Sequence, residues 1–397
     1  MPVIDIVIIG TEEDLILAES GHRSIMLSKA FSESELVRKV VAINCPISFP
    51  RRLSNMLKGK KKIEDTYPLV SKQAGISIVK VNDKLYVVSL TSLFPESDSL
   101  FSRISRQLLV QKIRYALDKL QLNDFILWIS NPRIIDIASK IPSKIKIFDS
   151  IDNLLVHTET KKFYKKIKKA YDWVEHNVNL ICIASEGQRE MFSTSSKLFL
   201  LSNGVDKIFL NAVKHGVPED IKYIAKPIAG YAGALQDRLD VVLMEGVINL
   251  LPDYNFVFLG PVDDFLYIKP LTKYSNVHIL GNKRFKDIPS YIDSFDVCII
   301  PHKVNEFTKS MDPLKVYEYL ACGKPIVSTP VSGTEKFRDY IFIANNVSEF
   351  AESIKKAATG DNYQAYNKRK DIALEHAWNK KVTRVVTQIE TIAKEYI

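Results

Sequence analysis

The sequence lacks the features that mark membrane-spanning or secreted chains. No apolar run reaches the roughly 18–20 residues that a helix needs to cross a bilayer. Residues 3–10 have neither a basic n-region nor a small-residue cleavage site, and they predict a buried strand instead of a signal peptide. The four cysteines have no paired spacing, so neither a disulfide framework nor a zinc site is indicated. We therefore expect a cytoplasmic chain that needs no metal and no cofactor.

The length and the charge of the chain indicate how many domains it has and which partners it could bind. A chain of 397 residues fits two domains of about 150–200 residues, and 46% apolar with 25% charged residues is typical of a folded protein. Of the net charge of +9, the first 200 residues carry nearly all, with 30 Lys and Arg against 22 Asp and Glu. No nucleic-acid-binding motif accompanies this charge, so we expect no nucleic-acid partner. An anionic membrane surface, or a lipid phosphate within it, is the better candidate.

Short β-branched runs alternate with helical stretches along the whole chain, which predicts βαβ units and doubly wound parallel sheets. The predicted strands are 3–9, 37–44, 76–81, 85–90, 124–130, 144–149, 180–185, 197–202, 227–233, 255–260, 276–280, 296–301, 325–329 and 340–344. Ligands of such sheets bind outside the carboxyl ends of the strands, so functional residues are expected in the loops that follow them.

The strongest local signal is the helix predicted after residue 312. Asp312 is a natural N-cap, and Pro313 suits the first helical position. Lys315 is unexpected, because a cation in the first turn opposes the helix dipole unless an anion binds there. A diphosphate would fit, and Glu318 on the same face could accept hydrogen bonds from ribose hydroxyls. The alternative is an exposed Lys315–Glu318 pair worth about 0.3 kcal/mol.

Two glycine turns follow other predicted strands. Gly233 would let the backbone approach a ligand closely, and Arg238 would add a second cation near the same diphosphate. Gly281, Asn282 and Lys283 form a rim suited to a nucleobase. An ordinary solvated loop explains the second turn equally well.

Several ordered motifs together resemble a known family. They are Tyr-Ala-Gly-Ala-Leu at 231–235 followed by Arg238-Leu-Asp240, Phe-Leu-Gly-Pro at 258–261, Ile-Leu-Gly at 279–281, and Pro313-Leu-Lys315 with Glu318 and Gly323-Lys-Pro325. This order is similar to the donor domain of GT-B glycosyltransferases, specifically the group 1, family 4-like enzymes of bacterial cell-surface polysaccharide synthesis, which include teichuronic-acid-type transferases. The resemblance covers about residues 144–385 and includes Asn203-Gly204-Val205-Asp206 and His376-Ala377-Trp378.

The resemblance implies two Rossmann-like doubly wound domains that face each other across a cleft. An acceptor domain would span 1–204, a nucleotide-sugar donor domain 205–378, and a helix at 379–397 would pack back on the acceptor domain. Lys315, Arg238 and the Gly233 turn would hold the donor diphosphate, Glu318 the ribose, and residues 281–283 the base. The donor-side set implied in this way is Gly233, Arg238, Gly281, Asn282, Lys283, Met311, Asp312, Lys315 and Glu318. Many relatives carry a second Glu where this chain has Ser310, so the contact to the donor sugar differs.

The first domain offers candidates for the acceptor side. Residues 146–153 end a predicted strand and resemble the Tyr-Asp-x-x-Asp segment of the same family. Asp152 is the first candidate for a general base that deprotonates an acceptor hydroxyl, and Asp149 is the second, although either could instead cap a helix. Arg23 and Glu186 are expected to contact the acceptor.

Two basic helices are predicted in the first domain, at 101–120 and 159–178. Their apolar stripes, which include Ile104, Leu108 and Leu117 in the first helix and Ile167, Tyr171 and Val174 in the second, should face the core. The surplus of lysine and arginine on their other faces suggests peripheral binding to the inner face of the cell membrane.

The sequence thus favours a metal-independent transfer of a sugar from a UDP-sugar to a hydroxyl of a glycan or lipid-linked acceptor. Two alternatives remain. A sugar-nucleotide 2-epimerase shares this architecture but would change the sugar nucleotide without an acceptor. A non-catalytic partner subunit would keep the fold, and a failure to bind UDP would favour it.

Overall fold

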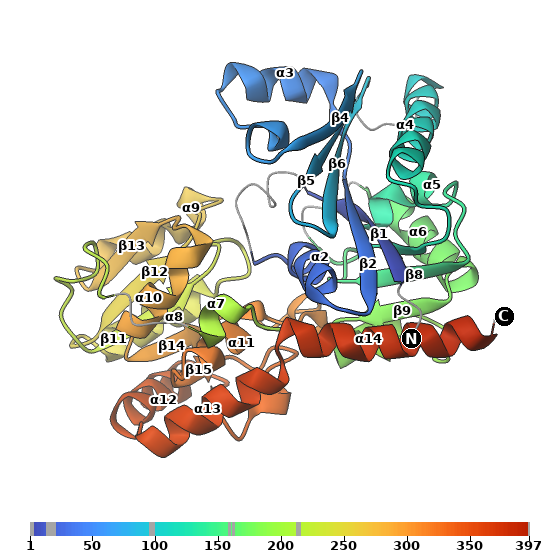
Figure 1. The fold of residues 1–397 in the computed structure, drawn as a ribbon. Coiled ribbons are helices and arrows are strands. Elements are labelled where there is room, and N and C mark those ends of the chain that lie inside the picture. The colour runs from blue at the N-terminus through green and yellow to red at the C-terminus, as the bar shows by residue number, and fades with distance from the viewer. Residues whose placement is uncertain are drawn as a thin grey trace. The chain divides into compact units, whose positions relative to one another are not determined.

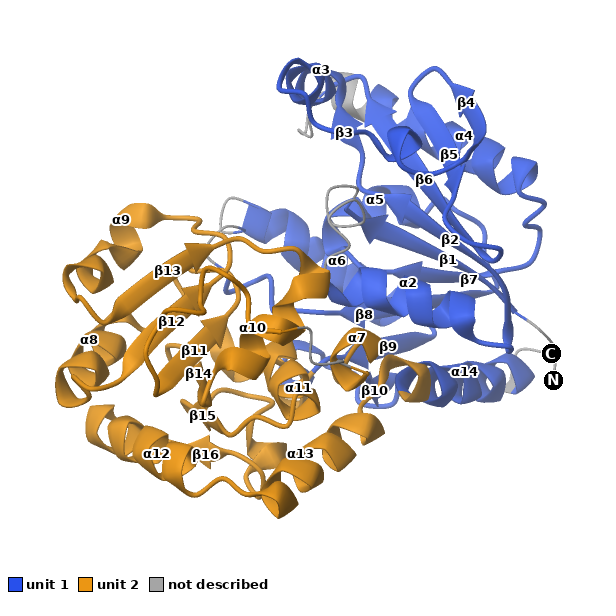
Figure 2. Ribbon diagram, turned by 60° about the vertical axis from the view of Figure 1, so that its left-hand side comes forward, with its two compact units in different colours: residues 1–184, 189–201, 381–397 blue, residues 185–188, 202–380 orange. Residues whose placement is uncertain are grey.

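The computed structural model describes residues 4–12, 21–94, 100–157, 160, 163–211 and 216–395 (Figure 1). The chain divides into two compact units (Figure 2). Unit 1 contains residues 1–184, 189–201 and 381–397, and unit 2 contains residues 185–188 and 202–380. The chain therefore returns to unit 1 at its C-terminal end.

Unit 1 is built on one sheet with the strand order β10-β9-β8-β7-β1-β2-β6-β5-β4. The pairs from β10 to β6 are parallel, whereas β5 and β4 are added to β6 as antiparallel strands. The strands are β1 Ile4–Thr11, β2 Val37–Asn44, β3 Ile47–Ser48, β4 Leu69–Gln73, β5 Ile76–Lys80, β6 Leu85–Ser92, β7 Ile126–Ile129, β8 Ile145–Ser150, β9 Leu180–Ile183 and β10 Leu198–Leu200.

Helices accompany this sheet. Successive strands are added on one side of β1 first and then, from β7 on, on its other side, so the topological switch point lies between β1 and β7. The helices are α2 Arg23–Glu33, α3 Phe49–Leu57, η1 Ile63–Asp65, α4 Leu100–Lys119, η2 Pro132–Ile134, α5 Ile135–Ala138, α6 Tyr164–Asn177, η4 Glu186–Met191 and α14 Trp378–Glu395. In α6 the predicted stripe is buried at Ile167, Tyr171 and Val174. In α4 the prediction was wrong at Ile104 and Leu108, which are exposed, because the buried face lies one position further along, at Ser105 and Leu109.

Unit 2 contains a parallel sheet with the order β13-β12-β11-β14-β15-β16. Counted along the chain this is 3-2-1-4-5-6, the order of a dinucleotide-binding Rossmann sheet, whose ligand crevice lies where the order reverses. That switch point falls between β11 and β14. The strands are β11 Ile228–Ala232, β12 Asn255–Leu259, β13 Val277–Gly281, β14 Val297–Ile300, β15 Ile326–Ser328 and β16 Phe342–Ile343.

Two apolar cores lie on the two faces of the second sheet. One contains Phe295, Tyr319 and Leu320, and the other contains Met244 and Phe350. Because both faces are covered, the strands are near-continuous apolar runs. The helices are α7 Lys207–Leu210, α8 Val241–Leu250, α9 Phe265–Ile268, η5 Lys269–Lys273, η6 Phe285–Asp287, α10 Ile288–Ser294, η7 Thr308–Ser310, α11 Leu314–Ala321, η8 Glu335–Phe337, α12 Val347–Thr359 and α13 Tyr363–Glu375.

Every strand predicted from the sequence is present in the structure, and the doubly wound α/β class is confirmed. Two strands were not predicted. β3 has only two residues, and β4 reads Leu-Val-Ser-Lys-Gln at an exposed edge, where nothing imposes alternation. None of the helices in the described ranges is both long enough and apolar enough to span a bilayer.

Candidate functional site

Gly233 lies at the switch point of unit 2, directly after β11. Its N–H donates to the carbonyl of Leu259 at 2.7 Å, which holds the turn against the end of β12. A Cβ atom at Gly233 would lie 2.2 Å from Cε and 2.3 Å from Nζ of Lys315. A larger residue would push the end of the Lys315 side chain away, so glycine here is what lets that side chain lie against the turn.

Lys315 extends from the first turn of α11 over a buried aromatic ring. Its Nζ lies 5.0 Å from the ring centroid of Tyr231, a cation–π contact. The Tyr231 hydroxyl is fixed between the carbonyl of Ala234 at 3.1 Å and Nε2 of His302 at 3.2 Å. The ammonium group is therefore positioned at the switch point by β11, by the loop after β14 and by the first turn of α11.

The second cation, Arg238, is brought to the same place by backbone pairing. The N–H of Lys303 donates to the Arg238 carbonyl at 2.8 Å, and Leu239 forms an antiparallel bridge with His302. The guanidinium lies 5.9 Å from the ring centroid of Phe307. The loop after β11 is thus tied to the loop after β14, so both predicted cations lie at one end of the sheet.

Among the residues that the structure describes, no ion pair neutralises Lys315 or Arg238. Burial, and then the charge of Arg238, lower the pKa of Lys315 to about 8, while Glu318 opposes the shift. Burial raises the pKa of Glu318 to about 7 against the opposing charge of Lys315. Two neighbouring cations and a carboxylate that is reluctant to ionise leave a surplus of positive charge, which a bound anion would neutralise.

His302 completes the cluster and was not predicted. It is 1% exposed, and burial, followed by the charges of Lys315 and Arg238, lowers its pKa well below the usual value. Its Nδ1 has no hydrogen-bond partner within the described ranges. The ring is therefore neutral, and it fixes the Tyr231 hydroxyl. Its position directly after Pro301, at the end of a predicted strand, was the available signal.

The predicted base rim has a different character. Gly281 has φ +67°, no atom of the described residues lies within 4 Å of where its Cβ would be, and its carbonyl accepts the Gly260 N–H at 2.9 Å. Asn282 is exposed. Lys283 forms an ion pair with Asp220 at 2.6 Å, and Tyr291 donates to the same carboxylate. Gly281 and Asn282 are thus open to a ligand, whereas Lys283 is held by unit 2 itself.

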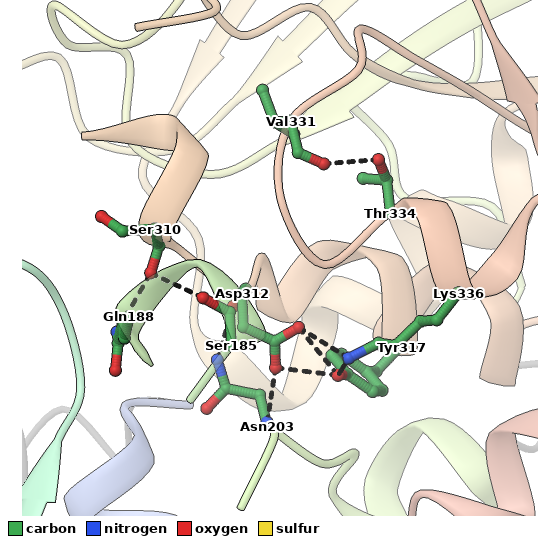
Figure 3. A network of polar contacts seen from close by, with 9 residues as sticks. All are labelled: Ser185, Gln188, Asn203, Ser310, Asp312, Tyr317, Val331, Thr334 and Lys336. Atoms are coloured by element: carbon green, nitrogen blue, oxygen red, sulfur yellow. Dashed lines mark hydrogen bonds and ion pairs between the residues drawn. The ribbon is translucent and has the colours of Figure 1, made fainter. Parts of the chain in front are cut away.

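The structure places Asp312 and Met311 differently from the prediction that Asp312 caps the helix and that both residues face the donor. The residue at the N-cap of α11 is Pro313, and no side chain caps the helix. The Asp312 carboxylate is fully buried and accepts hydrogen bonds from the Asn203 N–H and the Tyr317 hydroxyl, with Lys336 paired to it at 2.9 Å (Figure 3). With no open side, Asp312 binds protein groups only, and Met311 is 3% exposed.

Ser310 is also turned inward. Its hydroxyl donates to the Phe307 carbonyl at 2.9 Å, and its own carbonyl accepts hydrogen bonds from Ser185 at 2.9 Å and Gln188 at 3.0 Å (Figure 3). The residue that stands in place of the usual Glu therefore anchors residues 185–188 of unit 2. Its side chain has no open direction in which to contact a sugar.

In unit 1, Arg23 and Asp149 form a buried ion pair. The guanidinium Nη2 and Nε lie 2.8 Å and 3.0–3.1 Å from the carboxylate oxygens, and the two side chains are 1% and 0% exposed. Each neutralises the other, so the pair is first of all a structural contact. The acceptor-side role of Arg23 and the role of Asp149 as a base stay predictions, and Asp149 lines the same cavity as Asp152.

Asp152 remains the better base candidate. It is partly exposed and lines a cavity of about 120 Å³ together with His22 and Glu12. Burial lowers the pKa of His22, and Asp152 is the largest opposing influence on it. Glu186 is exposed at the start of η4 and belongs to unit 2.

A larger cavity of about 440 Å³ lies beyond the ends of β1, β2, β6 and β7 in unit 1. Its charged lining is mainly basic, with Arg51, Arg106, Arg133 and Lys166 against Glu12 and Asp136. The Arg133 guanidinium stacks 4.5 Å from the ring centroid of Phe163. This cavity suits an anionic ligand with an apolar part.

Known proteins resemble the chain in sequence and in fold. Residues 226–359 match the family described as "Glycosyl transferases group 1". TuaH of Bacillus subtilis strain 168, named as a glycosyltransferase of teichuronic acid biosynthesis, is 25% identical over 202 residues. That match covers 49% of this chain and 51% of TuaH, so the two correspond over about half of their lengths.

The solved structures cover the whole chain. The α,α-trehalose 6-phosphate synthase of Burkholderia multivorans aligns over 100% of both chains with a TM-score of 0.68 at 10% identity. HepE of Anabaena, solved with UDP and glucose, aligns over 97% of this chain and 99% of its own with a TM-score of 0.64 at 14% identity. The resemblance expected from the sequence is therefore confirmed: the chain has the GT-B fold, and its residues 226–359 match the group 1 glycosyltransferase family.

Proposed function

We propose that this protein transfers a sugar from a UDP-sugar to a hydroxyl group of a glycan or lipid-linked acceptor in cell-surface polysaccharide synthesis. The observation that supports the proposal most is the uncompensated pair of cations, Lys315 and Arg238, against the Gly233 turn at the switch point of unit 2. The UDP in the HepE structure and the name of TuaH agree with this choice of donor and pathway.

On the donor side, Lys315 and Arg238 would bind the diphosphate, and Glu318 would accept hydrogen bonds from the ribose hydroxyls. Gly281 and Asn282 would border the base. As the bond between the anomeric carbon and the diphosphate oxygen breaks, negative charge grows on the departing diphosphate. The two fixed cations would stabilise that charge, which is the usual role of preorganised electrostatics in a protein site.

On the acceptor side, the attacking hydroxyl oxygen would form the new bond to the anomeric carbon, and its proton would pass to the carboxylate of Asp152. General-base catalysis of this kind contributes about 10²–10⁴-fold to a rate. We keep the division of the chain near residue 204, with the acceptor bound by unit 1 and the donor by unit 2. We also propose that unit 1 works at an anionic membrane surface.

A screen of UDP-sugars for nucleotide release, with extracted membrane lipids as acceptor, tests this function. Release of UDP that depends on the acceptor, together with a labelled lipid or glycan product, is the expected result. Interconversion of the sugar nucleotide without an acceptor would instead identify an epimerase. Absence of UDP binding would favour a non-catalytic partner.

Asp152→Asn tests the base within the same assay. The turnover rate should fall about 10²–10⁴-fold, while UDP affinity stays at the wild-type value because Asp152 lies in unit 1. Asp118→Asn, which makes the same change at an exposed carboxylate of unit 1 outside the proposed site, serves as the control. Wild-type turnover of Asp152→Asn would remove it from the mechanism.

A further inference from the structure

Helix α3 of unit 1 turns its apolar side outward, whereas an ordinary surface helix turns that side toward the core. Its large apolar residues point outward, with exposed fractions of 58% for Phe49, 42% for Leu53, 50% for Met56 and 78% for Leu57. No residue of the helix is buried. These four positions are spaced i, i+4, i+7 and i+8, so they form one continuous stripe on one side of the helix.

The polar side of the same helix is the side that holds it to the protein. Nη2 of Arg52 donates to the Ser89 hydroxyl on β6 at 2.7 Å. Single exposed leucines are common on soluble proteins and need no explanation. A stripe of four on one helix face, with an arginine turned inward, is different, because it exposes apolar area that folding could have covered.

The charge next to this stripe is of one sign. From Phe49 to Lys62 the chain has six basic residues and no acidic residue, namely Arg51, Arg52, Lys58, Lys60, Lys61 and Lys62. The loop folds back on the helix, since the N–H of Lys60 donates to the Asn55 carbonyl at 3.0 Å. Lys60, Lys61 and Lys62 border the same small cavity as Met56. The lysines therefore lie beside the apolar stripe.

We propose that α3 with the loop 58–62, the α3 surface, docks unit 1 on an anionic phospholipid bilayer. Phe49, Leu53, Met56 and Leu57 enter the boundary between headgroups and acyl chains, and the basic residues lie against anionic headgroups. An outward apolar stripe flanked by lysine and arginine is the pattern of helices that lie in a membrane interface. The basic charge favours this occupant over an uncharged apolar partner.

The α3 surface also adjoins the basic cavity of about 440 Å³ in unit 1. Ile47 and Ser48, which lead into the helix, and Arg51 within it form part of the cavity wall. Phe94, 43% exposed, lies on the same wall. Docking would therefore bring the basic cavity to the bilayer, where the acceptor is a lipid that carries an anionic group. This step rests on the proposed transferase activity, whereas the docking itself does not.

The test is sedimentation of the full-length protein with vesicles of phosphatidylcholine alone or mixed with phosphatidylglycerol. The wild-type protein should bind the mixed vesicles at low salt and lose most of that binding at high salt. Leu53→Ser/Leu57→Ser and Lys58→Glu/Lys61→Glu should each reduce the partition coefficient by about thirtyfold or more. Binding of either variant at the wild-type level would overturn the proposal.

Matched controls separate the α3 surface from a general effect of charge or apolarity. Lys165→Glu/Lys168→Glu makes the same charge change on α6, and Val242→Ser/Leu266→Ser removes apolar side chains that are 78% and 76% exposed in unit 2. Both should bind vesicles like the wild type. Loss of binding in the α6 variant alone would assign docking to that helix and overturn the proposal.

Folding and function are monitored independently. Circular dichroism shows whether the α3 variants fold, and UDP binding, which belongs to unit 2, should be unchanged in them. If vesicle binding persists but UDP does not bind, the proposed function fails and the docking stands. If the protein instead forms dimers that Leu53→Ser/Leu57→Ser abolishes, the surface pairs with a second copy and the proposal is wrong.

Discussion

The buried charges of the two units are handled in opposite ways. In unit 1 Arg23 and Asp149 neutralise each other through a bidentate ion pair with no exposed side. In unit 2 Lys315 lies beside Arg238, and its pKa is lowered to about 8 by burial and by that second cation. Both clusters lie near the carboxyl ends of parallel strands, and both contain residues predicted to bind substrate or to act as a base.

The difference separates a structural charge from a binding charge. A buried ion pair whose hydrogen bonds are complete has nothing left to offer a ligand. A cation held near another cation is destabilised until an anion arrives, so ligand binding recovers the energy that folding spent. Asp312 with Lys336 is a second complete pair, and it lies within unit 2 itself.

The largest effect is expected from breaking the complete pair in unit 1. Asp149→Asn leaves the Arg23 guanidinium buried without its counter-charge, which should reduce the free energy of unfolding by about 3–5 kcal/mol. Denaturant titration measures this loss. UDP affinity of the folded fraction should not change, and a variant as stable as the wild type would show that the pair contributes nothing.

Removing the charge of Lys315 should have the reverse outcome: ligand binding should weaken and stability should rise. Lys315→Met should weaken UDP binding about 10- to 100-fold, the contribution of one charge-assisted hydrogen bond to phosphate. The melting temperature of the ligand-free protein should rise by about 2–4 °C, because a destabilised cation is replaced by an apolar chain of similar length. A fall in melting temperature would mean that Lys315 is stabilised by protein contacts, as Arg23 is.

The packing of Gly233 against Lys315 can be tested by adding one methyl group. Gly233→Ala places a Cβ atom about 2.2 Å from Lys315 Cε, so the ammonium must move away from its position. We expect about a tenfold loss of UDP affinity, which corresponds to about 1.4 kcal/mol. Gly216→Ala is the control, because its φ is also positive but no atom lies within 4 Å of the added Cβ. Equal affinities of the two variants would argue against the contact.

The smallest effect is a pH dependence that only the incomplete cluster should show. Lys315 must be protonated to bind a diphosphate, so UDP affinity should fall as pH rises through about 8. Glu318 must be ionised to accept hydrogen bonds from ribose, so affinity should also fall as pH drops through about 7. Calorimetry across this range should give a maximum between the two values. Lys315→Met should remove the alkaline limb and Glu318→Gln the acid limb.

The sequence predicted the fold well because apolar periodicity and strand spacing are local properties. Lys315 and Gly233 were found for a related reason: each departs from what its local element prefers. The sequence could not show that Asp149 pairs with Arg23, 126 positions away, or that Asp312 pairs with Lys336. Those pairings depend on which strand ends become neighbours, and a carboxylate after a strand has the same pattern whether it binds protein or ligand.

The outward stripe on α3 shows the same limit in another form. Periodicity identified apolar stripes in the first domain, but it does not say which way a stripe faces. Residues 58–62 include four lysines, and only the fold places Lys60, Lys61 and Lys62 beside Met56. Ile104 and Leu108 were assigned to the core for the same reason and are exposed.

The central claim is that Lys315, whose charge no ion pair neutralises, binds the donor, whereas Lys336, which is paired with Asp312, does not. Calorimetric titration of UDP into the wild type, Lys315→Met and Lys336→Met between pH 7 and 8 tests it directly. Both variants remove one lysine charge from the same unit. We predict that Lys336→Met binds UDP like the wild type and that Lys315→Met binds about 10- to 100-fold more weakly. Equal affinity of Lys315→Met and the wild type, or a comparable loss in Lys336→Met, would contradict the account.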